Sequence, residues 1–220
     1  MKFIEKNLKD EPKTLIAYRA TPSASYAGFG DKGKLLKTAL CKAQGYICCY
    51  CMRRIDENSM SVEHYIAQKH HELSPFSIEI HRDNELKFTN LLAACNSKER
   101  GCSEIRGNKP LTINPLNKNI EILLSFKNIN YEYTTETVKH DIENILQLNK
   151  DKKLEDARKV VLDNVRENLP KNSKEWTTSR LNKELEKWKN LDKNGRFRPF
   201  CQVAISYLNK KIHQVSRQKA

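Results

Sequence analysis

Long apolar runs are missing from this 220-residue sequence. No stretch approaches the roughly 18 consecutive apolar residues that suggest a transmembrane helix. The first residues, MKFIEKNLKDEPK, lack the apolar core of a signal peptide. We therefore expect no membrane association and a cytoplasmic location. Internal repeats and low-complexity segments are also missing, and a chain of this length can bury one core or a small catalytic module with a helical extension.

Acidic residues are in the minority. The chain has 40 Lys and Arg against 27 Asp and Glu, a formal net charge of +13 and a pI near 9.4. Residues 139–220 hold 20 basic and 11 acidic residues (+9), and residues 1–138 hold the other 20 and 16 (+4). An excess of positive charge favours a polyanionic partner such as nucleic acid, through phosphate contacts and counterion release. Ordinary solvation of helix faces by lysine remains an equally good account of the C-terminal excess.

Cysteines occur in an odd number, seven, and without a secretory leader they are expected in a reducing compartment. Spaced cysteine pairs there bind metal more often than they form disulfides. Cys48 and Cys51 form a C-x-x-C pair, and Cys95 and Cys102 follow about 45 residues later. Four thiolates from two loops can close a tetrahedral site, so we predict a structural Zn²⁺ at these four residues. The other three are expected to be buried thiols or to point away from the metal: Cys41, Cys49 and Cys201.

The chain divides into three segments. Residues 1–45 are irregular apart from a helix expected over 31–44, which Gly45 would end. Residues 46–117 carry nearly all the chemically distinctive side chains. Residues 118–220 begin with a hairpin over 122–135, followed by four amphipathic helices with short connections. These patterns predict an α+β fold that is mainly helical, with a helical bundle as its C-terminal extension.

Several short motifs surround the cysteines. The run SVEHYI lies between the two cysteine pairs, FTNLLAACN ends near Cys95, and RGNK follows Cys102. The series as a whole resembles the motif of HNH endonucleases. That resemblance implies a ββα-metal module at residues 46–117, in which a strand pair and a helix carry one catalytic divalent ion and a zinc ion braces the two ends.

A narrower resemblance covers most of residues 35–165. The segments GYICCYCMRRI, VEH, NLLAACN and GNKPLTINPLN are similar to those of the PtuB family, the HNH nuclease subunits of Septu and some retron anti-phage systems. The resemblance implies a role in antiviral defence and a partner, an ATPase subunit of the PtuA type, that regulates the nuclease.

Phosphodiester hydrolysis requires an activated water and a cation that stabilises charge on the phosphate and the leaving oxygen. An imidazole can act as general base at neutral pH, which makes His64 the candidate base. By the resemblance, Asn90 orients that base and Glu63 binds the catalytic ion. Oxygen ligands suit Mg²⁺ or Mn²⁺. The expected activity is endonucleolytic cleavage of nucleic acid, with DNA favoured.

The second ligand of the catalytic ion is open at this stage. The family pattern leads to Ser103, directly after the fourth cysteine, while Asn96 and Glu104 are the alternatives. Because neighbouring residues of a strand point to opposite faces, Glu63 and His64 can share a site only at a strand end or a bulge.

Three arginines lie near the metal motifs in sequence and are candidates for contacting phosphate: Arg53, Arg54 and Arg106. An ordinary solvated surface is an equal alternative for each. An alternative function for the whole chain is a catalytically inactive, zinc-containing module that binds nucleic acid or docks on the ATPase.

Overall fold

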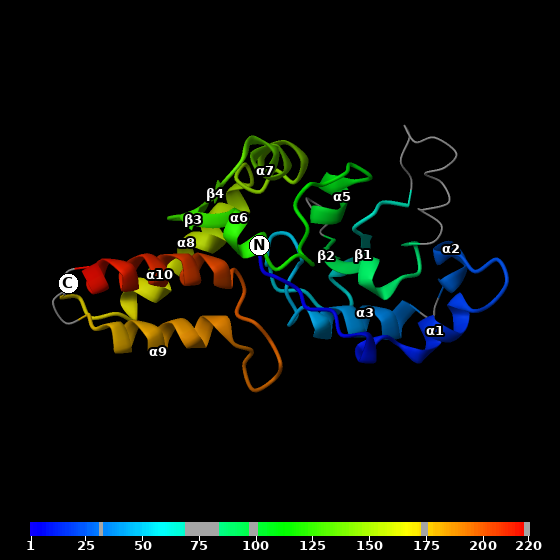
Figure 1. Ribbon diagram of the computed structural model, residues 1–220, viewed down its shortest axis with the longest axis horizontal. Coiled ribbons are helices and arrows are strands. Elements are labelled where there is room, and N and C mark those ends of the chain that lie inside the picture. The colour runs from blue at the N-terminus through cyan, green and yellow to red at the C-terminus, as the bar shows by residue number, and fades with distance from the viewer. Residues whose placement is uncertain (31–32, 69–83, 97–100, 173–175, 218–220) are drawn as a thin grey trace.

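The computed structural model describes residues 1–30, 33–68, 84–96, 101–172 and 176–217. These residues form helices and two small antiparallel sheets, which confirms the expected α+β class. The elements gather in two halves (Figure 1). One half holds the N-terminal helices, the first sheet and α5, and the other holds the second sheet and the C-terminal helices. None of the helices in the described ranges is long and apolar enough to cross a membrane.

The N-terminal segment consists of short elements before one longer helix. They are η1 (Leu8–Asp10), α1 (Lys13–Arg19), α2 (Tyr26–Phe29) and α3 (Gly33–Ala43). In α3, Leu36 and Leu40 lie one turn apart and are fully buried, as the apolar spacing predicts. Gly45 follows with a positive φ of 56°, which confirms it as the residue that ends the helical path.

The first sheet pairs β1 (Met60–His64) with β2 (Leu91–Cys95) in antiparallel register, from Met60 opposite Cys95 to His64 opposite Leu91. A short helical turn, η3 (Phe88–Asn90), leads into β2, and α5 (Cys102–Arg106) comes after it. All five residues of β2 are buried. The strand is therefore enclosed on both faces, with α3 and α5 among the elements that contact it.

The hairpin expected at 122–135 is confirmed. After the short helix α6 (Ile120–Leu123), β3 (Leu124–Lys127) pairs with β4 (Asn130–Tyr133), and Asn128 takes a left-handed conformation in the turn. Asparagine tolerates that conformation better than most residues, and it stands where a tight hairpin turn needs it.

The C-terminal helices are α7 (Glu136–His140), which continues as the π-helical turn η4 (Asp141–Ile145), then α8 (Lys152–Glu167), α9 (Thr178–Lys189) and α10 (Cys201–Arg217). Helix α10 packs against α9, α8 and β3, which gives a three-helix assembly beside the hairpin. The first of the four expected helices is formed by α7 and η4 together, the second part being π-helical, and α7 contacts β4.

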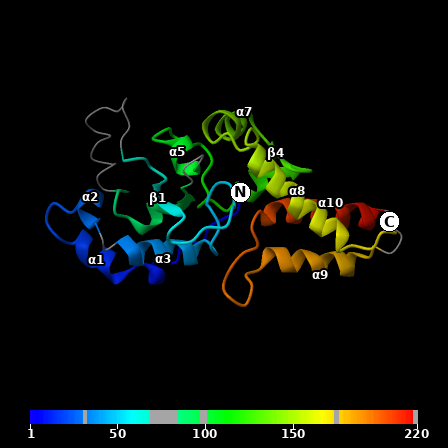
Figure 2. The same ribbon diagram turned by 180° about the vertical axis from the view of Figure 1, so that it is seen from behind.

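The two halves meet through the loop between α9 and α10, which reaches back to the end of α3 (Figure 2). The amide of Phe197 donates to the carbonyl oxygen of Gly45 at 2.9 Å, and the amide of Phe200 donates to that of Met52 at 3.0 Å. The side chain of Arg54 donates to the carbonyl oxygens of Gly45, Tyr46 and Phe197. These bonds fix the turn that carries Cys48 and Cys51, the knuckle between Ile47 and Arg54, to the C-terminal half.

Candidate metal centre and active site

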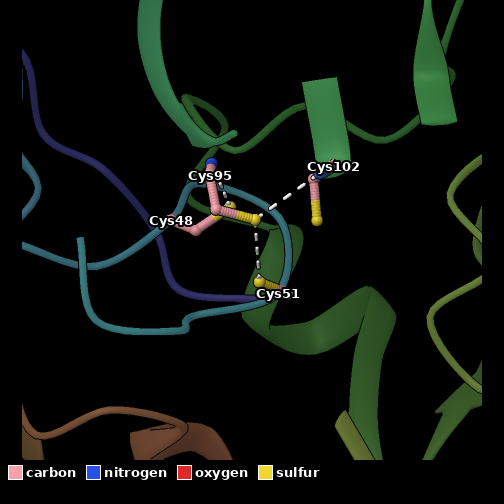
Figure 3. Close-up of side chains that lie close together, drawn as sticks. All are labelled: Cys48, Cys51, Cys95 and Cys102. Carbon is pink, nitrogen blue, oxygen red and sulfur yellow. Dashed lines mark hydrogen bonds between the residues drawn. The ribbon is translucent and has the colours of Figure 1, made fainter. Parts of the chain in front are cut away.

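Four buried cysteines converge as the sequence predicts (Figure 3). The sulfur atoms of Cys48, Cys51, Cys95 and Cys102 all lie within 4.8 Å of one another. Zn–S bonds of about 2.3 Å in a tetrahedron put neighbouring sulfur atoms about 3.8 Å apart, and the sulfurs of Cys51 and Cys95 are 3.7 Å apart. The cluster therefore has the size and the donor atoms for a structural zinc ion.

Three elements position these thiols. Cys48 and Cys51 lie in a tight knuckle closed by the bridge between Ile47 and Arg54. Cys95 ends β2, and Cys102 begins α5. Backbone amides add to the site, because that of Cys95 donates to the sulfur of Cys48 at 3.3 Å and that of Cys102 to the sulfur of Cys95 at 3.5 Å. Donors aimed at sulfur stabilise the thiolate form that a metal requires.

The other cysteines are buried and lie outside the cluster: Cys41, Cys49 and Cys201. Burial raises the pKa of the Cys41 thiol to about 12 and that of Cys201 to about 11. At neutral pH both therefore behave as small apolar side chains.

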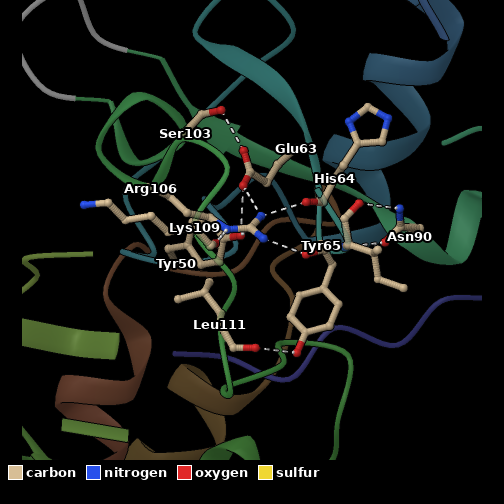
Figure 4. A network of polar contacts seen from close by, with 10 residues as sticks. Tyr50, Glu63, His64, Tyr65, Asn90, Ser103, Arg106, Lys109 and Leu111 are labelled. Carbon is tan, nitrogen blue, oxygen red and sulfur yellow. Dashed lines mark hydrogen bonds and ion pairs between the residues drawn. The ribbon is translucent and has the colours of Figure 1, made fainter. Parts of the chain in front are cut away.

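Glu63 is 5% exposed, and its carboxylate lies in a network of donors (Figure 4). Oε1 accepts hydrogen bonds from the hydroxyl of Tyr50, at 3.1 Å, and from the guanidinium of Arg106. Oε2 accepts one from the hydroxyl of Ser103, at 2.6 Å. The acid at the end of β1 and the residue after the fourth cysteine are therefore side by side, although they are 40 positions apart.

Arg106 is 1% exposed, and its guanidinium donates hydrogen bonds to groups inside the protein. Besides Tyr50 and Glu63, its guanidinium reaches the carbonyl oxygens of His64 at 2.7 Å, Tyr65 at 2.6 Å and Lys109 at 3.1 Å. Burial would lower the pKa of Arg106, but its contacts with Tyr50 and Glu63 raise it above its ordinary value, so the guanidinium stays charged. The expectation that Arg106 contacts nucleic acid is at odds with this position, because an enclosed side chain cannot reach a phosphate.

His64 is the last residue of β1 and is 8% exposed. Its ring points away from Arg106 and Ser103, whereas the carboxylate of Glu63 points toward them (Figure 4). The ring lies edge-on to that of Tyr26, with centroids 4.6 Å apart. Its Nε2 atom is 3.0 Å from the carbonyl oxygen of Glu85, a position that requires a proton on Nε2 and leaves the lone pair on Nδ1. Burial lowers the pKa of His64 below its ordinary 6.5, so the ring is neutral near pH 7.

Asn90 is buried and does not bond to the ring of His64 within the part of the chain that the structure describes. Its side chain accepts from the amide of Ile66, at 2.7 Å, and donates to the carbonyl oxygens of Ile66 and Asn84. Ile66 comes two residues after His64, and Asn84 directly precedes Glu85. Asn90 thus ties the segment that follows His64 to the segment whose Glu85 carbonyl oxygen accepts from the imidazole.

The three candidates for the second ion ligand have different surroundings in the structure. Ser103 contacts Glu63 directly. The side-chain amide of Asn96 donates to the carbonyl oxygen of Met60, at the opposite end of β1 from Glu63. The carboxylate of Glu104 accepts from the amide of Gly101 and caps α5. Of the three, Ser103 has the geometry to share an ion with Glu63.

Arg53 and Arg54 also differ from each other. Arg53 is partly exposed beside the cysteine cluster. Arg54 donates hydrogen bonds to backbone carbonyl oxygens at the junction of the two halves. Its guanidinium therefore stabilises the fold and is not free to bind a ligand.

Sequence reasoning missed the residues that complete the site. Tyr50, between two cysteines, donates to Glu63; Tyr26 covers His64; and the backbone of Glu85 fixes its ring. Only Tyr50 stands inside a recognised motif, and a tyrosine there has many possible roles.

No protein-family model matches the chain, and a search of curated proteins finds no match either.

Proposed function

We propose that the chain is a metal-dependent HNH endonuclease that hydrolyses phosphodiester bonds of nucleic acid, with DNA as the favoured substrate. The observation that carries the proposal is the meeting of Glu63 and Ser103. It joins the end of β1 to the start of α5, directly beside a cysteine cluster that fits zinc. The order strand, strand, helix, with a four-cysteine cluster at the end of β2 and the start of α5, supports the ββα-metal arrangement that the sequence resemblance implies.

The oxygen atoms at this point suit a hard divalent cation. Arg106 and Tyr50 occupy Oε1 of Glu63, so Oε2 and the Ser103 hydroxyl are the pair that would hold Mg²⁺ or Mn²⁺. Such an ion, when bound, supplies positive charge to the phosphate and the leaving oxygen. Arg106 fixes the carboxylate in one orientation, which pre-organises the ligand pair.

His64 is the proposed general base. Its contact with the Glu85 carbonyl oxygen fixes the tautomer with a free lone pair on Nδ1. A pKa lowered by burial keeps that lone pair unprotonated at neutral pH, when a general base has to accept a proton from water. Asn90 acts as a positioning residue, because it holds the backbone segments on which the ring depends.

The biological setting is proposed on the sequence resemblance. A PtuB-like subunit would act in antiviral defence together with an ATPase of the PtuA type that regulates cleavage. Most of residues 35–165 carry that resemblance.

One observation favours the alternative, a catalytically inactive zinc-containing module that binds nucleic acid or docks on a partner. Glu63 and His64 leave the end of β1 in different directions, and Arg106 neutralises the carboxylate inside the protein. Catalysis by both residues at one phosphate requires a rearrangement at this strand end, whereas a binding module requires none.

The test is cleavage of labelled duplex DNA, single-stranded DNA and RNA in Mg²⁺ or Mn²⁺, with and without the ATPase. Wild type is compared with His64→Ala and with His213→Ala, an exposed histidine of α10. We expect His64→Ala to lose activity by about 10²- to 10⁴-fold, as loss of a general base does. His213→Ala should cleave like wild type, and zinc content should be equal in all three.

Cleavage that persists at the wild-type rate in His64→Ala would remove the proposed base. No cleavage of any substrate by the wild-type chain with the ATPase present, while nucleic acid is still bound, would establish the binding module instead.

A further inference from the structure

Residues 176–200 carry part of the positive charge of the C-terminal half. Residues 176–200 contain seven basic residues and three acidic ones, a net charge of +4. This segment is α9 with the loop that leads to α10. The cations are Arg180, Lys183, Lys187, Lys189, Lys193, Arg196 and Arg198.

The three acids of the segment are already engaged. Glu184 accepts from Lys187 at 2.6 Å and from the indole of Trp188 at 3.2 Å. Glu186 lies 3.6 Å from Lys189. Asp192 accepts from two backbone amides of its own turn. Within the part of the chain that the structure describes, no acid is within ion-pair distance of the other cations, which include Arg180, Lys183 and Lys193.

Two arginines of the loop are ordered by aromatic rings. The guanidinium of Arg196 lies 4.8 Å from the ring centroid of Tyr46, and that of Arg198 lies 5.1 Å from the centroid of Trp188. A guanidinium stacked on a ring keeps its N–H edges free, and those edges match phosphate oxygens. Both side chains are exposed and can reach an anion, and because each already packs on a ring it loses less conformational entropy on binding.

Helix α8 provides the contrast. It has five basic and four acidic residues, a net charge of +1. Lys152 pairs with Glu155, and both Lys159 and Arg166 pair with Asp163. Its cations are thus balanced by acids one turn away, which cancels much of the field that a distant polyanion would feel.

The cations of α9 follow the helix axis. The unpaired Arg180 and Lys183 are three residues apart, and Lys187, which pairs with Glu184, lies four residues further on. This spacing puts the three on one face over about 10 Å. The buried face of α9 is formed by other residues of the same helix, including Leu181, Leu185 and Trp188. At the C-terminal end of α9 the loop continues this basic surface, with Arg198 on Trp188 of α9 and Arg196 on Tyr46 of the cysteine-bearing half.

We propose that α9 and the loop to α10 bind the phosphate backbone of a nucleic acid duplex outside the cleavage site. This α9 surface consists of Arg180, Lys183, Lys193, Arg196 and Arg198. The inference rests on the proposed function only in its choice of nucleic acid as the polyanion. Because the surface joins both halves of the protein, a duplex held there is held in a fixed relation to the knuckle that supports the metal centre.

Binding is measured by fluorescence anisotropy with a labelled 30-base-pair DNA duplex and an RNA duplex of the same sequence, at several salt concentrations and without Mg²⁺ or Mn²⁺. The test protein is the full chain with Arg180→Gln, Lys183→Gln and Lys193→Gln. The matched control carries Lys152→Gln, Lys159→Gln and Arg166→Gln, which removes the same charge from α8. Zinc content and helical circular dichroism confirm that both variants are folded.

We expect the α9 variant to bind at least tenfold more weakly at 0.1 M salt, and its slope of log K against log salt to fall by about 2 to 3, since each lost phosphate contact removes about 0.9. The control should stay within about twofold of wild type. Poly-glutamate of equal charge should compete poorly with the DNA duplex and with the RNA duplex for binding to the protein.

Equal losses in both variants would reduce the effect to net charge and overturn the proposal. Equal competition by poly-glutamate would overturn it in favour of an acidic protein partner. Because binding is measured without the catalytic ions, its outcome is independent of cleavage. If the wild-type protein binds through the α9 surface but never cleaves, the proposed nuclease activity is contradicted and the α9 surface is not. If the protein cleaves, and the α9 variant binds as well as wild type, the α9 surface is contradicted and the nuclease activity is not.

Discussion

The carboxylate of Glu63 and the guanidinium of Arg106 form an ion pair that is almost completely withdrawn from water, with 6% and 1% of the two side chains exposed. Both charges have further hydrogen-bond partners: Tyr50 and Ser103 donate to the carboxylate, and three backbone carbonyl oxygens accept from the guanidinium. Burying two charges is costly, and the cost is met only when geometry and hydrogen bonding are complete. The pair therefore fixes the end of β1 against α5 in one arrangement.

Removing one partner of this pair should be far more damaging than removing both. We expect Arg106→Met to lower the free energy of unfolding by about 3 to 5 kcal/mol, because it leaves a buried carboxylate without a counter-charge. Glu63→Met together with Arg106→Met should recover part of that loss, since no charge then remains in the apolar site. Urea denaturation of wild type, both single variants and the double variant measures the coupling. A double variant less stable than Arg106→Met would show that the ion pair is not what holds these elements.

Metal removal should unfold the cysteine-bearing half. The four cysteines come from the knuckle, from the end of β2 and from the start of α5, so an ion bound by them would tie three segments together. Structural zinc sites contribute to folding directly, with apparent binding free energies of about 10 to 16 kcal/mol in small zinc-binding peptides. We expect Cys102→Ser to lose zinc and to melt at lower temperature, as measured by elemental analysis and circular dichroism.

Cys41→Ser is the matched control for that variant, because Cys41 is equally buried but lies outside the cluster, on α3. It should retain a full equivalent of zinc. A zinc content that is unchanged in Cys102→Ser would exclude the four-cysteine site.

The features predicted correctly from the sequence are those that local chemistry determines. Thiols in spaced pairs have few uses in a reducing compartment other than metal binding, so the four cysteines that cluster could be chosen before their geometry was known. The hairpin at 124–133 and the end of α3 at Gly45 follow from side-chain patterns and turn residues within a few positions.

The features that could not be predicted depend on contacts between distant segments. Arg106 stands in the polar stretch RGNK and looks like a surface residue, yet its acceptors include carbonyl oxygens at His64 and Tyr65, about 40 positions earlier. Arg54 is engaged by Phe197, 143 positions away. Nothing near an arginine in sequence distinguishes a solvated guanidinium from a buried one, because the difference lies in where other backbone segments run.

Gly45 should tolerate no side chain. Its φ is +56°, and an added Cβ would overlap the ring of Phe197 and lie 2.8 Å from the Cδ2 atom of Leu191. We expect Gly45→Ala to reduce the free energy of unfolding by about 2 to 4 kcal/mol, through backbone strain of about 1 kcal/mol and steric displacement of the loop. Gly195→Ala separates these effects, because Gly195 has a φ of +70° and no atom within 4 Å of an added Cβ.

Chemical denaturation of both glycine variants checks this prediction. Gly195→Ala should lose only about 1 kcal/mol, the cost of the left-handed conformation. Equal losses at the two positions would mean that the loop between α9 and α10 moves away without cost, and that the junction of the two halves is weak.

Lys6 gives the chain a distinctive pH dependence of stability. Its Nζ atom is buried 4.1 Å from the centroid of the Phe88 ring and has no hydrogen-bond partner in the described part of the chain. Burial lowers the pKa of Lys6 from 10.5 to about 7. In the unfolded chain the amine stays protonated up to about pH 10.4. Below pH 7 the folded protein must therefore carry a buried charge, and the charge reduces stability most there.

Lys6→Met should accordingly be more stable than wild type at pH 6.5, by roughly 1 to 3 kcal/mol. The difference should shrink as the pH rises from 7 toward 10.5, because the unfolded wild-type chain then binds a proton that the folded chain does not, and its stability increases with pH. Denaturation at pH 6.5, 8 and 9.5 measures the difference, and comparing two variants at each pH cancels the titration of all other groups. Lys9→Met, at an exposed lysine nearby, should show no such trend. A constant difference between Lys6→Met and wild type across this range would mean that the amine of Lys6 keeps its ordinary pKa in the folded protein and reaches water.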